Sequence, residues 1–335
     1  MFKKDKIRID TFLIKEEQTL ENFLREKMPF LKQTNYKKIL SEKRLFLNGE
    51  SLTNTKIRLQ KGDLITFETP INLEPKINKN INILFEDEHL IVLDKPPNLP
   101  VHPAGKYYFN TLLKLLEDQL NLKLYLINRL DKETSGLLLI AKNKEVLIKM
   151  QDLFSKGTIT KKYFAIVFGT PKKKDFMIKN YLIKKNKLTK QNNIIRDHMV
   201  VSDEKSENGT IAQTRVIEKF SFNKNSFKKS GLEETYSLLE ISLLTGKRHQ
   251  IRAHLSDIGL PIVGDKQYGK NPDLFVKISE NEDLVSEEEI IKSTGAKRQL
   301  LHCFKLVFEH PLTKELLSFE IDLPEDMKEF INDKK

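Results

Sequence analysis

The sequence predicts an α+β protein in two parts, a small unit at residues 10–70 and a larger unit at residues 82–330. Its length of 335 residues suits two domains of ordinary size. Hydrophobic residues form 39% of the chain and charged residues 31%, a mixture typical of folded proteins. Short strand-like runs alternate with short helical patterns in both parts. Residues 71–81 show neither pattern and are rich in Lys and Asn, which predicts a linker.

The first unit is expected to contain two short helices that lead into a small sheet. Residues 20–28 place Leu and Phe side chains on one helical face, and Thr19 is a suitable N-cap for that helix. A second helix is expected around Ile39. Strands at residues 44–47 and 64–67 each lie beside a turn signal, an Asn-Gly pair in one case and a Gly-Asp pair in the other.

Positive charge gathers on this unit and on the chain as a whole. The protein carries 58 Lys and Arg against 47 Asp and Glu, a formal net charge of +11. Such an excess attracts polyanions such as nucleic acids, although it also favours solubility alone. Four basic residues lie on or after the second helix: Lys37, Lys38, Lys43 and Arg44. They predict a compact nucleic-acid clamp, and the alternative is an ordinary small domain with a solvated basic face.

The second unit mixes strands with short helices. Four strands are expected where apolar residues run together, at residues 88–94, 136–141, 163–169 and 236–244. Residues 175–209 are polar and rich in Lys and Asn, so we expect only part of them to be strand, with an exposed loop at 202–209. An acidic insertion at residues 269–296 predicts a solvated helix or loop.

Several classes of protein and site are excluded by what the sequence lacks. The longest apolar runs are far shorter than the roughly 18 residues of a membrane span, and no secretory signal is expected. Cys303 is the only cysteine, so an intramolecular disulfide and a Cys-based zinc cluster are impossible. Signatures of phosphate-binding loops, dinucleotide-binding folds, zinc proteases and serine hydrolases are missing. These observations predict a cytoplasmic protein.

Three segments remain in which polar residues lie at the ends of apolar strands, namely residues 128–136, 161–163 and 245–254. Taken singly, each has a plain structural interpretation. Asp131 can cap a turn, and Arg129 and Arg252 can be surface cations. Tyr163 can be a core residue with its hydroxyl at the rim.

Together these segments resemble the motifs of the RluA-type pseudouridine synthases, and the resemblance extends over residues 82–330. Five motifs occur in the family's order: Asp94-Lys95-Pro96 with His102-Pro103; residues 128–137 (Asn-Arg-Leu-Asp-Lys-Glu-Thr-Ser-Gly-Leu); 161–169 (Lys-Lys-Tyr-Phe-Ala-Ile-Val-Phe-Gly); 245–252 (Thr-Gly-Lys-Arg-His-Gln-Ile-Arg), continuing through 259–269; and Leu301-His302 with His310-Pro311. Two residues depart from the pattern, since Asn128 stands for a His and Lys247 for an Arg. Lys247 keeps the charge but loses the bidentate fork of a guanidinium.

The first unit resembles the αL RNA-binding module, with Leu47-Asn48-Gly49 as its signature and lysines in place of the usual Arg on its second helix. The combined resemblance implies this module followed by a mixed, mainly antiparallel β-sheet domain with flanking helices and a central cleft. It implies an isomerase that converts uridine to pseudouridine in RNA without a metal or cofactor. Such a module is found in members that act on large-subunit ribosomal RNA, which we expect as the partner, with transfer RNA as the alternative. We expect a monomer.

The resemblance also assigns roles to residues. Asp131 is implied as the catalytic carboxylate and Arg252 as its cationic partner. Tyr163 is expected to stack on the target uracil, while Arg129 fills the space that the uridine leaves when it flips out of its stack. Phosphate contacts are expected from six basic residues: Lys37, Lys38, Lys43, Arg44, Lys161 and Lys162.

Two other functions remain open at this point. One is a non-catalytic RNA-binding factor with the same fold, which would bind RNA without forming a product. The other is a hydrolase that uses Asp131 and releases free uracil, which would need a second carboxylate at a suitable separation. Glu133 is the nearest acidic residue in the sequence, and we expect it to face solvent.

Overall fold

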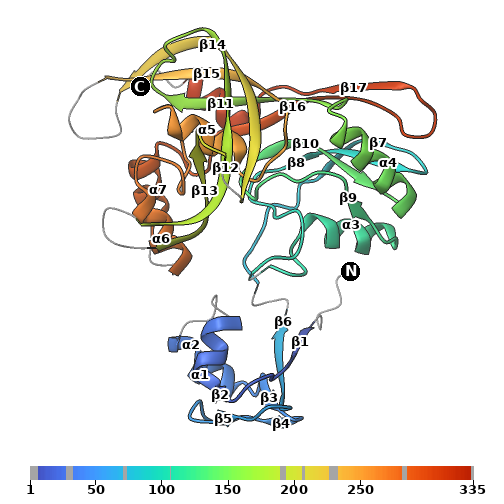
Figure 1. The fold of residues 1–335 in the computed structure, drawn as a ribbon, viewed down its shortest axis with the longest axis vertical. Coiled ribbons are helices and arrows are strands. Elements are labelled where there is room, and N and C mark those ends of the chain that lie inside the picture. Colours follow the sequence, from blue (N-terminus) through green and yellow to red (C-terminus); the bar gives the residue numbers. More distant parts are fainter. Residues whose placement is uncertain are drawn as a thin grey trace. The chain divides into compact units, whose positions relative to one another are not determined.

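The computed structural model describes residues 7–27, 33–70, 74–105, 107–188, 194–205, 208–225, 233–280 and 285–332 (Figure 1). The chain divides into two compact units, one of Met1–Ile77 with His102–Leu115 and one of Asn78–Val101 with Leu116–Lys335. The return of His102–Leu115 to the first unit is not visible in the sequence. Part of the expected linker, residues 71–73, lies outside the described residues. None of the helices in the described ranges has the length and apolar character that crossing a bilayer requires.

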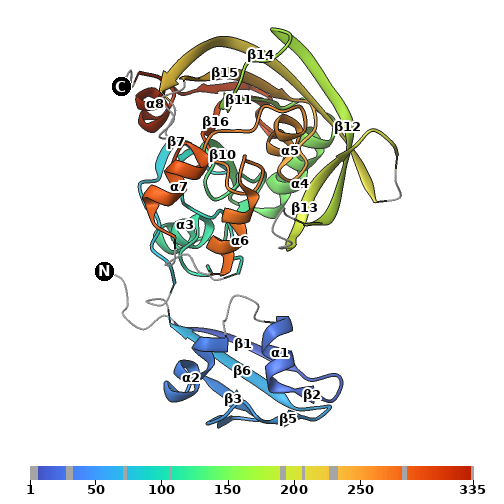
Figure 2. The ribbon, with the colours of Figure 1, turned by 90° about the vertical axis from the view of Figure 1, so that its left-hand side faces the viewer.

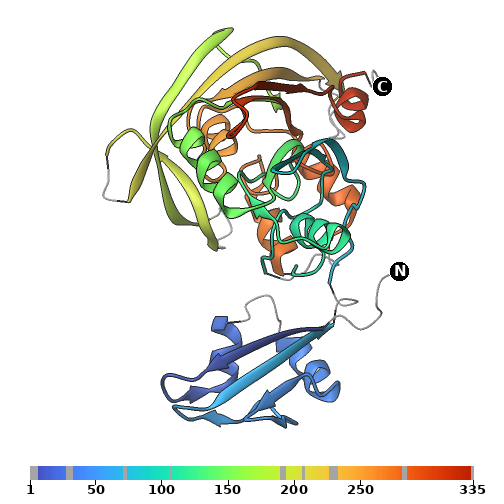
Figure 3. The same ribbon diagram turned by 90° about the vertical axis from the view of Figure 1, so that its right-hand side faces the viewer.

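The first unit is a four-stranded sheet with two helices on one face. Its elements are β1 (Ile7–Leu13), β2 (Gln18–Thr19), α1 (Leu20–Lys27), α2 (Gln33–Ser41), β3 (Leu45–Leu47), β4 (Glu50–Ser51), β5 (Arg58–Leu59) and β6 (Leu64–Pro70). The sheet order is β1-β6-β3-β4, and β2 pairs with β5 separately. Both helices lie on the same side of β1 and β6 (Figures 2 and 3). Leu20, Phe23 and Leu24 of α1 pack in one core with Ile65 and Phe67 of β6.

Local hydrogen bonds explain why the predicted elements of this unit form. The Thr19 hydroxyl accepts a hydrogen bond from the Asn22 N–H at 3.3 Å, which confirms the predicted N-cap. Asn48 and Gly49 both have positive φ, 52° and 89°, as a tight hairpin turn requires. The Asn48 amide also accepts from Leu64 N–H and donates to Asp63, so it joins the two predicted turns.

Strand β1 was not predicted, and its residues face opposite to what their polarity suggests. Ile7, Ile9 and Leu13 lie on the exposed side, whereas the half-buried side carries Arg8 and Asp10 beside Phe12. Pairing with β6 along its whole length, from Ile7 opposite Pro70 to Leu13 opposite Leu64, supplies the order that the pattern does not indicate.

The second unit is built on an eleven-stranded sheet that is mainly antiparallel, as predicted. Its strands are β7 (Asn82–Glu86), β8 (Leu90–Lys95), β9 (Tyr125–Leu126), β10 (Ser135–Ala141), β11 (Thr160–Phe168), β12 (Asp175–Leu188), β13 (Ile194–Ser202), β14 (Gly209–Asn225), β15 (Glu233–Leu243), β16 (Leu301–Glu309) and β17 (Leu316–Glu320). The main path runs β13-β12-β14-β15-β11-β16-β10-β8-β7, with β17 on β16 and β9 on β10. Among these pairs, only β10 and β16 run parallel.

Short helices flank this sheet. They are α3 (Leu112–Leu120), which begins in the first unit and continues into the second, α4 (Lys144–Ser155), α5 (Gln250–Asp257), α6 (Pro272–Glu280), α7 (Glu287–Thr294) and α8 (Glu325–Asn332). The long strands β14 and β15 arch over α5 (Figures 1 and 2). Ala253 of α5 packs with Leu182 of β12, Met199 of β13 and Ala212 of β14, which fixes α5 against the sheet.

The polar segment 175–209 contains far more strand than its composition suggested. It forms β12 and β13 and reaches the start of β14. Lys179, Lys184 and Lys185 of β12 are exposed, whereas Ile178 and Leu182, on one face of the same strand, are buried, so a polar sequence still supplies one apolar face. The acidic insertion forms α6 and α7. The Ser286 hydroxyl caps α7, whose first turn is acidic, as a helix N-terminus favours.

Candidate active site

Asp131 lies in the loop that enters β10, and a glycine lets this loop pass close to β16. Gly136 has φ 108° and pairs with Cys303 in the short parallel contact of β10 with β16. A Cβ atom on Gly136 would lie 2.2 Å from the carbonyl oxygen of Cys303, so no other residue fits without displacement of the backbone. The Thr-Ser-Gly sequence therefore sets the path of the loop that carries Asp131.

The Arg252 guanidinium bridges two carboxylates. Its Nη1 atom donates to Asp131 Oδ2 at 2.7 Å. Its Nε and Nη2 atoms donate to Asp265 at 2.6 and 2.9 Å, in a bidentate pair. The Asp265 side chain is fully buried, whereas the Asp131 side chain is 30% exposed. The arrangement holds the guanidinium rigidly and leaves Asp131 accessible from one side.

Asp265 is a residue of the site that sequence reasoning did not single out. It accepts the backbone N–H groups of Gln267 and Tyr268, each at 2.9 Å, in addition to both nitrogens of Arg252. These bonds and the Arg252 charge lower its pKa although burial opposes them. The only sequence feature that could have indicated Asp265 is its position within residues 259–269, which continue the motif that contains Arg252.

Burial and nearby positive charge have opposite effects on the pKa of Asp131. Burial alone raises the pKa of this carboxyl group, but the Arg252 charge, His249, and hydrogen bonds from Arg252 and Gln299 outweigh it and lower the pKa to about 2. Asp131 is therefore a carboxylate at neutral pH, with Oδ2 bound to Arg252 and Oδ1 available.

The buried side chain of Lys95 connects the loop that carries Asp131 to the loop that follows β8. Lys95 has no exposed surface, and its Nζ donates to the carbonyl oxygens of Pro96, Leu99 and Lys132 at 2.7, 3.0 and 3.1 Å. Burial, followed by the nearby Arg298 charge, lowers the pKa of Lys95 to about 7. The three carbonyl oxygens match the three donors of an ammonium group, so this lysine ties the residue after Asp131 to the loop that follows β8.

Glu133 does not face solvent as we expected. Its carboxylate pairs with Lys266 at 2.7 Å and accepts the Gln299 N–H at 3.2 Å. The Arg298 guanidinium donates to its carbonyl oxygen at 3.2 Å. The Gln299 amide also donates to Thr134 Oγ1 at 2.6 Å. The loop from Asp131 to Thr134 is thus held at each residue, and the Glu133 carboxylate is already paired.

Tyr163 lies on β11 opposite Cys303 of β16, next to an irregularity in the pairing of these strands. Its side chain is almost fully buried. Burial, the Cys303 thiol to which it hydrogen-bonds, and the charge of Asp131 raise the pKa of the Tyr163 hydroxyl well above its usual value. The hydroxyl therefore stays protonated, and the negative charge of Asp131 contributes to this by opposing loss of the proton.

Arg129 is exposed on the same loop, two residues before Asp131. The preceding Asn128, which stands for the family His, accepts the Leu139 N–H at 3.0 Å through its side-chain oxygen. Asn128 thus supports the strand behind the loop and leaves Arg129 to face outward.

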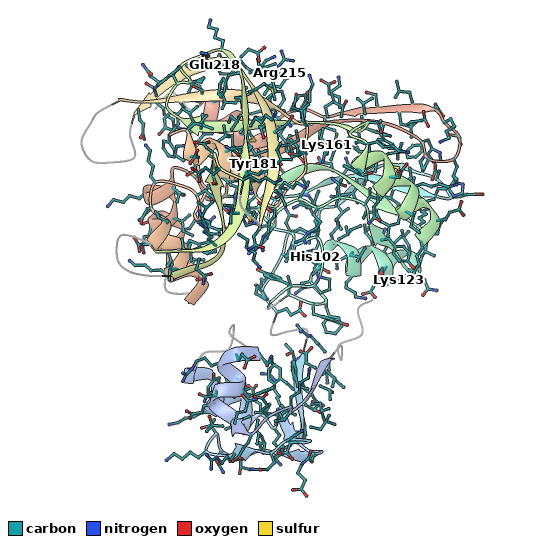
Figure 4. All side chains as sticks on the ribbon, in the orientation of Figure 1. His102, Lys123, Lys161, Tyr181, Arg215 and Glu218 are labelled. Carbon is teal, nitrogen blue, oxygen red and sulfur yellow. The ribbon has the colours of Figure 1, made fainter. Side chains whose placement is uncertain are left out.

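The six basic residues expected to contact phosphate fall into two groups. Lys37, Lys38 and Lys43 are exposed on the first unit. The other three are engaged within the chain, and their expected phosphate contacts stay a prediction. Arg44 donates hydrogen bonds to the Glu68 carbonyl oxygen and to the Glu42 carboxylate, and its guanidinium lies over the Phe67 ring. Lys161 is only 8% exposed, and its Nζ lies 4.6 Å from the centre of the Phe154 ring (Figure 4). Lys162 forms an ion pair with Glu240 at 2.8 Å.

Known proteins that are similar to this chain indicate its family. The sequence model of the family described as RNA pseudouridylate synthase matches residues 89–257. The chain is 33% identical over 268 residues to the ribosomal large subunit pseudouridine synthase C of Rickettsia typhi, covering 75% of this chain and 82% of that protein. It is 30% identical over 236 residues to the mitochondrial tRNA pseudouridine(32) synthase of Saccharomyces cerevisiae, covering 70% of this chain and 47% of that protein.

A solved structure shows the same fold. The human RNA pseudouridylate synthase domain containing 4 superposes with a TM-score of 0.51 at 24% identity, over 75% of this chain and 91% of that chain. This likeness supports the α+β class and the mainly antiparallel sheet. The family match and the identity to the Rickettsia enzyme show that the chain belongs to the RNA pseudouridine synthases, the isomerases that convert uridine to pseudouridine in RNA.

Proposed function

We propose that Asp131 is the catalytic carboxylate of this pseudouridine synthase. The observation that carries the proposal is that the two carboxylate oxygens differ in their contacts. Oδ2 is bound to Arg252 at 2.7 Å, whereas Oδ1 accepts no hydrogen bond from the described residues, and the side chain is 30% exposed. A carboxylate that stays ionised in a largely buried site can stabilise or trap positive charge at a sugar carbon, as carboxylates do in glycosidases.

The isomerisation requires an ionised carboxylate by either available route. The N1–C1′ bond breaks, its electron pair leaves with uracil, and Asp131 either adds to C1′ or takes the 2′ proton. The base then turns and C5 bonds to C1′, as the Asp131–C1′ bond breaks in the first route or as the 2′ proton returns in the second. C5 then loses a proton and N1 gains one. Because its hydroxyl remains protonated, Tyr163 is suited to stacking on uracil and to hydrogen bonding rather than to taking the C5 proton.

We infer that the target uridine leaves its stack to reach Asp131, in a cleft of the second unit. Unstacking a nucleotide costs a few kcal/mol. Arg129 is exposed beside Asp131, and a planar guanidinium can stack between bases and hydrogen-bond to them. Arg129 is therefore suited to occupy the space from which the uridine departs.

We infer that the first unit is an αL-type module that binds the RNA backbone. Lys37 and Lys43 line a shallow groove of about 510 Å³ together with Lys56 and the polar segment 53–55. Lysines beside hydroxyl and amide groups suit phosphate oxygens, whatever the base sequence. Relatives named for the large ribosomal subunit favour ribosomal RNA as the substrate, with transfer RNA as the second candidate.

A two-carboxylate hydrolase has little support among the described residues around Asp131. Glu133 is paired with Lys266, and Asp265 is fully buried in its bidentate bond with Arg252. Neither is placed to serve as the second acid or base that glycosidases use. Incubation of purified protein with ribosomal RNA or transfer RNA, followed by mass spectrometry of nucleosides, tests this. We expect pseudouridine without free uracil from ribosomal RNA, whereas free uracil, or no product from either RNA, would contradict the proposal.

The pH dependence of the reaction should show a flat neutral region. The Asp131 pKa is lowered to about 2, so the carboxylate loses its charge only as the pH falls toward that value. Single-turnover rates measured on the acid side should therefore stay constant from about pH 6.5 down to about pH 5. An acid limb with a midpoint near pH 6 would show that Asp131 is not held ionised by Arg252.

Neutralising the three exposed lysines of the first unit should weaken RNA binding in a salt-dependent way. We expect the combined substitution of Lys37, Lys38 and Lys43 by Gln to lower the magnitude of the slope of log K against log salt by about 2–3, because each lost phosphate contact removes about 0.7–0.9. Filter binding at several salt concentrations measures the slope.

The matched control replaces three exposed lysines that form ion pairs on the second unit, Lys149, Lys156 and Lys328. This control has the same change in net charge, so long-range attraction falls equally in both variants. Equal slopes for the two variants would show that the first unit makes no special phosphate contacts.

A further inference from the structure

His249 is an imidazole beside Asp131 for which the proposed mechanism gives no role. It is the N-cap residue of α5, with a left-handed backbone (φ 52°, ψ 18°) and no capping hydrogen bond from its side chain. A left-handed conformation is uncommon for residues with a side chain, and it persists where the surroundings impose it. Since the ring does not cap the helix, the strained backbone serves to direct the imidazole toward Tyr268 and Asp131.

Two contacts fix which imidazole nitrogen carries the proton. Tyr268 Oη accepts the Met199 N–H at 2.9 Å and lies 3.0 Å from His249 Nδ1. Because the Tyr268 oxygen already accepts from Met199, we assign its hydroxyl proton to the bond with Nδ1, which then acts as the acceptor. Burial, opposed by Asp131 and assisted by the Arg252 charge, lowers the pKa of His249 to about 4, so the ring is neutral at pH 7. Its single proton lies on Nε2.

This Nε2–H group faces the oxygen of Asp131 that Arg252 does not bind. The distance from Nε2 to Asp131 Oδ1 is 3.7 Å, longer than a hydrogen bond, whereas Arg252 holds Oδ2 at 2.7 Å. The His249 side chain is 11% exposed. The site therefore contains an oriented, neutral N–H donor that is not used by Asp131 and that lies where Oδ1 must meet its substrate.

We propose that His249 Nε2–H donates a hydrogen bond to O2 of the target uracil while the N1–C1′ bond breaks. This inference rests on the assignment of Asp131, because Oδ1 then acts at C1′ or at the neighbouring 2′ position, and O2 is the base oxygen nearest C1′. The electron pair of the broken bond passes into the base, and negative charge collects on N1 and O2. A preorganised donor stabilises that charge without giving up its proton.

Three substitutions of His249 separate this role from a structural one. His249→Gln places an amide N–H near the position of Nε2, whereas the amide of His249→Asn reaches only as far as Nδ1. Asn tolerates the left-handed backbone, so the Asn variant controls for strain. We expect His249→Asn and His249→Ala to lower the single-turnover rate by about 10²–10³-fold, as loss of one such donor does elsewhere. His249→Gln should recover most of that loss.

RNA affinity and thermal stability provide the second readout. A donor that acts on charge formed during bond breakage changes the rate and not the binding of substrate. The dissociation constant for RNA should therefore be the same for His249→Gln and His249→Asn, and the Asn variant, which tolerates the left-handed backbone, should melt no lower than the Gln variant. Equal rates for these two variants, or a rate loss that follows a fall in melting temperature, would overturn the proposal.

Modified target nucleosides identify the acceptor. Sulfur is a weak hydrogen-bond acceptor, so with 2-thiouridine at the target position the wild type should react no faster than His249→Asn. With 2′-deoxyuridine at that position the difference should persist. The reverse result would assign the Nε2–H group to the ribose 2′-hydroxyl and overturn the assignment to O2.

The outcome with Asp131 separates failure of this inference from failure of the function on which it rests. If Asp131→Asn is inactive while His249→Asn retains the wild-type rate, only the role of His249 is wrong. If Asp131→Asn is active, both assignments are wrong.

Discussion

Asp131→Asn should lower the single-turnover rate of pseudouridine formation by at least about 10⁴-fold, the scale on which enzymes lose activity when a central reacting group is removed. The substitution keeps the size of the side chain and its ability to accept a hydrogen bond from Arg252. It removes the negative charge that both routes of the reaction need at the sugar. Rapid-quench kinetics with excess enzyme over a short RNA substrate measures this rate.

Asp131→Asn should leave RNA affinity close to that of the wild type, because most of the binding energy comes from phosphate contacts. Glu133→Gln is the matched control, since Glu133 lies on the same loop and also pairs with a cation, Lys266. We expect this control to keep most of the activity. A variant lacking the Asp131 charge that still forms pseudouridine at a comparable rate would refute the assignment.

Arg252→Met should damage both stability and activity. The substitution leaves the fully buried Asp265 without its bidentate partner, and breaking a buried ion pair in this way costs about 3–5 kcal/mol of the free energy of unfolding. Without the guanidinium, burial raises the pKa of Asp131. The rate should then fall as the pH drops through that raised value, whereas the wild-type rate stays flat there. Chemical denaturation and pH–rate profiles measure the two effects.

Arg215 provides a matched control for Arg252. It forms a bidentate pair with Asp175 on the surface of the sheet, at 2.6 and 3.0 Å (Figure 4). Exposed pairs contribute about 0–1 kcal/mol, so Arg215→Met should be nearly neutral. The double variant Arg252→Met, Asp265→Asn should regain part of the lost stability but not the activity, because it removes the unpaired buried charge without restoring the partner of Asp131. Equal losses for Arg252→Met and Arg215→Met would contradict the structural account.

The sequence indicated the centre of the site but not its support. Asp131 and Arg252 could be paired from their motifs, although 121 residues separate them. The residues that hold the Asp131 loop were not found, because they come from distant segments and have ordinary identities: Lys95 precedes the loop, and Arg298 and Gln299 follow it by more than 160 residues. The carbonyl groups that a buried lysine binds depend on the fold and cannot be predicted from a sequence motif.

The charged residues show the same limit in another form. Lys43 and Arg44 are neighbours in the sequence, yet Lys43 is exposed and Arg44 is engaged with the Glu68 carbonyl. Composition counts both as equal cations, whereas the fold decides which one can meet an anion. The strand content of segment 175–209 was underestimated for a related reason. Its exposed lysines made the composition polar, although buried apolar residues form one face of its strands.

The most direct test of Asp131 as the catalytic group is a map of pseudouridines in cellular RNA. Cells that lack the protein are supplied with the wild type, with Asp131→Asn or with Glu133→Gln, at matched protein levels. We predict that specific uridines in large-subunit ribosomal RNA are modified with the wild type and with Glu133→Gln and unmodified with Asp131→Asn. Full modification of those uridines by Asp131→Asn would contradict the account.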